Sequence, residues 1–147
     1  MCYRDNTNVN EADYGVVSPQ LDDLTSTLMG DALDLLAEGM QLNVLLVMQT
    51  DCGKVESYEF ADDSPEHLLQ AAYEHVRRER NALYYAIAYE GAVEMDDGTY
   101  ADALILEFGE RGRPSFSAYS LFEGRGTGEQ FAWTDAAPAG EVEALLG

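Results

Sequence analysis

The stretch ALYYAIAYEGAVEMDDGTYADALILEFGERGRPSFSAYSLFE, residues 82–123, decides the fold class. It contains three runs of β-forming residues, 82–95, 99–110 and 115–123, with the period of two that is typical of strands. Asp96-Asp97-Gly98 joins the first two runs, and a second segment rich in glycine and proline joins the last two. We therefore expect three consecutive antiparallel strands, with a bulge or bend at Gly91.

The residues before this stretch predict two helices with a hairpin between them. Ser18-Pro19 and Ser64-Pro65 both place a favoured N-cap before a proline at the first helical position. The first helix extends to about residue 38 and stops at Gly39. Between the helices, runs 42–50 and 54–60 flank a turn that contains Gly53, so they predict an antiparallel hairpin.

Together these elements predict an α+β fold. We expect a two-layer sandwich, in which two main helices cover one face of an antiparallel sheet of about five strands. The order is α-β-β-α-β-β-β, with a final helical turn as an option within residues 140–146. This order resembles that of the roadblock, longin and profilin-like scaffolds over roughly residues 18–123. We expect residues 1–17 to form an N-terminal tail, 18–123 a single domain, and 124–147 a loop and a C-terminal tail that packs on the domain.

The charge of the chain restricts its partners. The 147 residues include 28 acids and 8 bases, for a net charge of −20, and Lys54 is the only lysine. Such a charge argues against nucleic acid and against anionic membrane surfaces. Three explanations remain open, namely solubility, a basic protein partner, or adaptation to high salt. The sequence shows no secretory signal and no apolar run of about 20 residues, so we expect a cytoplasmic protein.

Several acidic and nucleophilic residues are candidates for chemistry, and each has a simpler explanation. Asp96-Asp97-Gly98 fits a tight turn better than a calcium loop, because the following positions do not supply alternating oxygen ligands. Glu90, Glu94 and Glu107 could pair across strands, but acids that face outward from a sheet are the common case. Cys2 and Cys52 predict neither a disulfide framework nor a metal motif. We expect no catalytic, cofactor or metal site.

The second helix carries two further kinds of candidate. Arg77, Arg78 and Arg80 could contact an anion, although cations at a helix C-terminus are favoured by the macrodipole alone. His67 and His75 are eight residues apart, roughly 12 Å along a helix, so they cannot share one metal ion unaided.

Two groups of apolar residues are interface candidates. On the first helix, Met29, Leu33 and Leu36 widen the apolar arc beyond what one sheet requires. A wide apolar arc predicts a homodimer formed through this helix. On the strands, tyrosines at positions 85, 89 and 119 could line an exposed sheet face, and tyrosine is enriched at interfaces.

The function expected from these features is that of a small, acidic, soluble bacterial protein that acts as a noncatalytic protein-binding or regulatory module. An alternative is an acidic inhibitor or nucleic-acid mimic that binds a basic partner. A third option is a small enzyme that depends on carboxylates.

Overall fold

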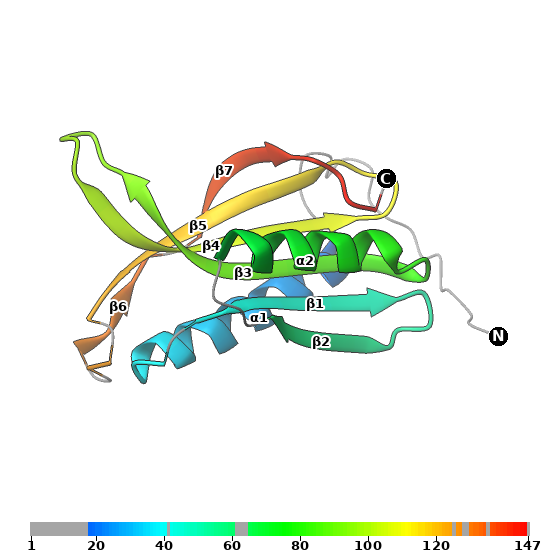
Figure 1. The fold of residues 1–147 in the computed structure, drawn as a ribbon, viewed down its shortest axis with the longest axis horizontal. Coiled ribbons are helices and arrows are strands. Elements are labelled where there is room, and N and C mark those ends of the chain that lie inside the picture. The colour runs from blue at the N-terminus through cyan, green and yellow to red at the C-terminus, as the bar shows by residue number, and fades with distance from the viewer. Residues whose placement is uncertain are drawn as a thin grey trace.

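The computed structural model describes residues 18–40, 42–60, 65–124, 126–127, 130–134 and 136–146. The predicted tail 1–17 and the predicted helix cap Ser64 lie outside these ranges. The described residues form, in order, α1 (Pro19–Ala37), β1 (Val44–Thr50), β2 (Val55–Phe60), α2 (Pro65–Arg78), β3 (Ala82–Glu94), β4 (Tyr100–Glu110), β5 (Ser115–Glu123), β6 (Ala132–Trp133) and β7 (Ala137–Val142) (Figure 1). The α+β class and its antiparallel sheet are confirmed, with seven strands where about five were predicted.

Local signals set the ends of α1 and of the hairpins. The Ser18 hydroxyl accepts a hydrogen bond from the Leu21 N–H, and Gly39 adopts a φ of 81° just past the last turn. A positive φ, as at Gly39, favours glycine because glycine has no Cβ to clash with the backbone. Gly53 and Gly98 have φ values of 81° and 85° in the β1–β2 and β3–β4 turns, as hairpin turns require.

The sheet has the strand order β2-β1-β3-β4-β5-β6, and β7 also pairs with β5. All of its neighbouring strands run antiparallel. Of the bulge or bend predicted at Gly91, the bulge is absent, since the β3–β4 register continues through the Gly91–Ala103 pair. A Cβ at Gly91 would lie 2.8 Å from Cγ1 of Ile105, so glycine instead makes room for that side chain.

The helices cover opposite faces of the sheet, which corrects the predicted two-layer arrangement. Residues of α1 pack with Val47 and with alternate residues of β3 and β4, whereas α2 packs with Leu46 and Met48. Figure 1 shows α2 in front of β3, while α1 runs behind β1. The cause is visible in β1, where consecutive residues are apolar and buried, as in strands that are covered on both faces.

The C-terminal segment is part of the sheet. β7 pairs antiparallel with residues Ser115 to Tyr119 of β5, and Leu145 and Leu146 are buried in the cluster that includes α2. The predicted final helical turn is therefore wrong, because the chain forms β7 as far as Val142. None of the helices formed by the described residues combines the length and the apolar character needed to span a membrane.

Candidate functional site

A groove lies between α1 and the β1–β2 hairpin, on the face of the sheet that α1 covers. Its volume is about 370 Å³, which falls within the range typical of ligand sites. The lining residues come from α1, β1 and β2, and they are Gln20, Asp23, Leu24, Thr27, Leu28, Asp31, Val47, Gln49, Val55 and Ser57. We call this feature the α1–β2 groove.

The α1–β2 groove combines apolar and acidic surface. Leu24 and Leu28 belong to the core and border the groove, and Val55 of β2 is 54% exposed beside them. Asp23 and Asp31 line the same groove and are both exposed. Since they are eight residues apart on one helix, they are separated by roughly 12 Å along its axis. An apolar segment that carries two spaced cations would complement this surface.

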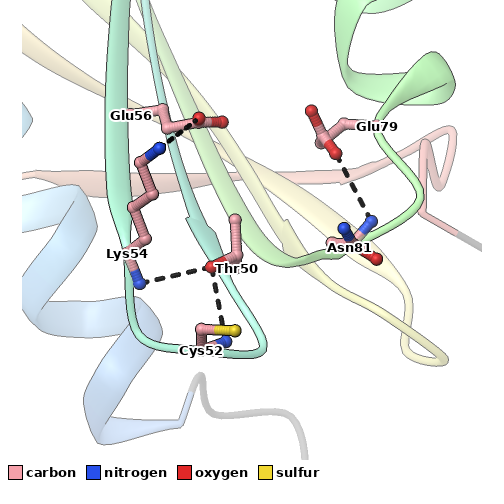
Figure 2. Close-up of polar contacts among 6 residues, drawn as sticks. All are labelled: Thr50, Cys52, Lys54, Glu56, Glu79 and Asn81. Carbon is pink, nitrogen blue, oxygen red and sulfur yellow. Dashed lines mark hydrogen bonds and ion pairs between the residues drawn. The ribbon is translucent and has the colours of Figure 1, made fainter. Parts of the chain in front are cut away.

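A smaller hollow lies at the turn of the β1–β2 hairpin, where Figure 2 shows its polar contacts. The Thr50 hydroxyl accepts hydrogen bonds from the backbone N–H groups of Cys52 and Lys54, at 3.3 and 3.2 Å. Nζ of Lys54 lies 3.6 Å from the Glu56 carboxylate, and the Asn81 N–H donates to Glu79. These contacts stabilise the turn, so we assign the polar residues of this hollow a structural role.

Cys52 is disulfide-bonded, whereas the sequence predicted no disulfide framework. The other cysteine of the chain, Cys2, lies outside the described residues. A cysteine in a disulfide presents no thiolate, so Cys52 is not a nucleophile in this state. Because disulfides are rare in reducing compartments, the bond also counts against the predicted cytoplasmic location, which stays a prediction.

The three glutamates considered as a cross-strand pair lie apart. Glu107 is 7% exposed beneath α2, where it accepts hydrogen bonds from the phenols of Tyr73 and Tyr89. Glu90 is on the other face and accepts a hydrogen bond from the Leu42 N–H, while Glu94 is exposed near the far end of β3. The structure therefore gives Glu107 an internal structural contact with two phenols and provides no shared site for the three acids.

The interface candidates on α1 are placed mainly in the core. Leu33 and Leu36 are 6% and 0% exposed, and Met29 is half-buried against the same cluster. The apolar arc of α1 is taken up by β3, β4 and Phe122 of β5, since the sheet beneath it is wide. The surface that motivated the predicted homodimer is thus unavailable at Leu33 and Leu36, which corrects the basis of that prediction.

The tyrosine candidates are also only partly accessible. Tyr85 is fully buried, and its phenol donates to the Ser115 hydroxyl at 2.9 Å. Tyr89 is half-buried and bonded to Glu107, and Tyr119 is half-buried on β5. Exposed aromatic surface instead occurs at Tyr100 and Trp133, which the sequence prediction did not select as interface residues.

The positive residues near the end of α2 contact other parts of the chain. Arg77 pairs with Glu143 at 2.5 Å, and Arg78 with Glu74 at 3.7 Å. The backbone carbonyl of Arg80 accepts a hydrogen bond from the Arg111 guanidinium. Arg77 and Arg78 therefore form ion pairs with carboxylates of the same chain. Binding of an external anion by the three arginines remains a prediction.

The remaining candidates are the two histidines of α2 and the acidic β3–β4 turn. The His75 ring lies 4.2 Å from the Tyr58 ring, centroid to centroid, whereas His67 is exposed. Asp97 accepts hydrogen bonds from the Thr99 hydroxyl and N–H, which lower the pKa of its carboxyl. The predicted hairpin turn is present between the paired residues Glu94 and Tyr100. Within the described parts of the chain, no group of three histidine, cysteine or acidic side chains could hold a metal ion.

The α1–β2 groove was not identified from the sequence, although part of its signal is present there. Gln20, Asp23, Thr27 and Asp31 recur at helical spacing beside the leucine stripe. Comparison with known proteins gives no further guidance, because no family model, curated protein or solved structure matches the chain.

Proposed function

We propose that this chain is a noncatalytic protein-binding module that takes up a basic segment of a partner protein in the α1–β2 groove. The observation that carries the proposal is the placement of Asp23 and Asp31 beside exposed Val55 and the edges of Leu24 and Leu28. The apolar surface would supply binding energy, and the two acids would select a segment with suitably spaced cations.

The overall charge supports a basic partner. The residues that line the groove include two aspartates and neither lysine nor arginine. A net charge of −20 on the whole chain would accelerate encounter with a cationic partner and repel anionic ones. The predicted alternative, mimicry of nucleic acid, requires rows of carboxylates at phosphate-like spacing and stays a prediction.

The geometry of the groove favours binding over carboxylate catalysis. Paired catalytic carboxylates, as in glycoside hydrolases, lie about 5–9.5 Å apart. The separation of roughly 12 Å between Asp23 and Asp31 along the helix axis exceeds that range. The two acids are therefore better placed to contact two cations of one partner than to act together on one bond.

A defined peptide tests the proposal. An acetylated and amidated peptide VTRTVTRT, when extended, places its valines and arginines on one face, with the arginines about 13 Å apart. The control peptide VTRRTVTT has the same composition but puts the arginines on opposite faces. We expect the first peptide to bind at least about tenfold more tightly, by fluorescence anisotropy at physiological salt.

Protein variants complete this test. Replacing both Asp23→Asn and Asp31→Asn should remove the preference for VTRTVTRT. The matched control, Asp34→Asn with Glu38→Gln, removes the same charge from exposed positions of the same segment outside the groove, so it should keep the preference. Equal binding of both peptides, or equal effects of the two double variants, would show only a general attraction of opposite charges and would overturn the proposal.

A further inference from the structure

We infer that the partner segment binds as an additional strand, antiparallel to β2, along the free edge of the sheet. This inference rests on the proposed function, because it describes how the segment enters the α1–β2 groove. Strand addition to a sheet edge is a general mode of peptide recognition, in which the backbone supplies affinity and alternate side chains supply specificity.

The first support is the position of β2. Among the strands that the described residues form, β2 lies at one end of the sheet and pairs with β1 alone. Thr50 and Lys54 are opposite each other, and the Thr50 N–H donates to the Lys54 carbonyl. Because hydrogen-bonded pairs alternate in an antiparallel ladder, Val55, Ser57 and Glu59 point their N–H and C=O groups away from β1.

The second support is that the outward-facing residues of this edge are exposed. Val55, Ser57 and Glu59 are all exposed, and the ladder between β1 and β2 has a continuous register from the Val44–Phe60 pair to the Gln49–Val55 pair. Edge strands in native proteins are commonly blocked by proline, bulges or lysine. The β2 sequence VESYEF contains no proline or lysine, and its two glutamates repel an acidic strand while tolerating a basic one.

The third support is the match between edge and groove. Val55 and Ser57 line the α1–β2 groove with their side chains, and their backbone groups are among those that face outward. In an antiparallel pair, residues directly opposite each other carry their side chains on the same face. Every second side chain of an added strand would therefore point into the groove, toward Asp23 and Asp31 on α1.

Backbone methylation of the VTRTVTRT probe tests the inference directly. In an antiparallel added strand, the N–H groups of the valines and arginines face β2, and those of the threonines face solvent. N-methylation at the second valine and the second arginine should weaken binding about tenfold or more, because two backbone hydrogen bonds are lost. N-methylation of two threonines should leave binding within about threefold of the unmodified peptide.

The protein edge can be blocked in the same way. Ser57→Pro removes an N–H that faces away from β1, and proline is tolerated on edge strands in that position. It should abolish binding of the peptide while thermal unfolding stays cooperative. The control Ser57→Ala removes the hydroxyl but retains the N–H, so Ser57→Pro should bind at least about tenfold more weakly than Ser57→Ala does.

The outcomes separate the inference from the proposed function. If neither methylated peptide loses affinity and Ser57→Pro still binds, strand addition is wrong, although the groove can still bind basic segments. If only methylation of the threonines weakens binding, the antiparallel direction is wrong. If the unmodified peptide shows no preference over VTRRTVTT, the proposed function itself fails.

Discussion

Tyr89 and Glu107 are diagonal neighbours on β3 and β4, and the Tyr89 phenol donates a hydrogen bond to the Glu107 carboxylate. Tyr73 of α2 donates to both oxygens of the same carboxylate, at 2.7 and 2.9 Å. A carboxylate that is almost fully buried is costly unless donors replace water. Glu107 therefore couples α2 to the sheet, and α2 in turn packs against the inner strand of the β1–β2 hairpin.

The hydrogen bond between Tyr73 and Glu107 should make a measurable contribution to the stability of the fold. Tyr73→Phe leaves the ring in place but removes one donor to Glu107, so it should lower the free energy of unfolding by about 1–3 kcal/mol. Tyr119→Phe is the control, because Tyr119 is similarly half-buried and the described residues give its hydroxyl no partner. It should change stability by less than about 0.5 kcal/mol. Urea unfolding measures both, and equal losses would contradict the assigned role of Glu107.

The buried phenols predict a loss of stability at alkaline pH. Burial, together with donation to Glu107, raises the pKa of Tyr73 and Tyr89 above the ordinary value of 10. Burial also raises the pKa of Tyr85 to about 12. Since the folded state holds these protons more tightly than the unfolded chain, their contribution is complete below about pH 10 and declines as pH rises through the raised values.

The alkaline decline can be assigned to a residue. The free energy of unfolding should fall between about pH 10 and pH 12, and Tyr85→Phe should make that fall shallower, because one group with a raised pKa is removed. Urea unfolding at successive pH values gives the slope. An unchanged slope for Tyr85→Phe, in a variant that remains folded at pH 7, would count against this assignment.

Because Leu33 is buried, truncation of its side chain should destabilise the fold. Leu33→Ala should lower the free energy of unfolding by about 2–5 kcal/mol, since the side chain is buried in the core beneath α1. Leu35 is two residues further along α1 and only partly buried, so Leu35→Ala should lower the free energy of unfolding by less. Chemical unfolding and sedimentation should be measured together. A Leu33→Ala protein of unchanged stability but altered oligomeric state would instead restore the dimer predicted from the sequence.

Salt should stabilise the fold. The chain has a net charge of −20, and ions screen the resulting repulsion. The ion pairs that the described residues form, Lys54–Glu56, Arg77–Glu143 and Arg78–Glu74, involve largely exposed side chains, so little is lost when they are screened. The melting temperature should rise from low salt to 0.5 M sodium chloride. A steady fall over that range would mean that favourable pairs dominate.

Elements with strong local signals could be predicted from the sequence. Ser18 before a proline begins α1, Gly39 ends it, and Gly98 forms the β3–β4 turn. In each case the backbone conformation depends on one or two residues, so a single sequence carries the information. The strand bounds followed from the period-two pattern for the same reason.

Features that depend on tertiary contacts were harder to predict. β7 includes Pro138 and Gly140, which are poor strand formers, and it becomes a strand by pairing with the edge of β5. Consecutive apolar residues such as Val47 and Met48 of β1, both buried, indicate that both faces of the sheet are covered. They do not indicate which helix covers which face. The α1–β2 groove requires α1 and β2 to be placed together, and no local pattern specifies that.

Amide chemical shift mapping of the labelled 147-residue chain tests most directly whether a basic segment binds in the α1–β2 groove. Titration with the VTRTVTRT peptide should shift the amide signals of residues 23–31 and 55–59, with smaller changes at the exposed acidic turn of residues 95–99. Salt should weaken the affinity without moving the site. Shifts that spread evenly over acidic surfaces, or that centre on another part of the chain, would contradict the claim.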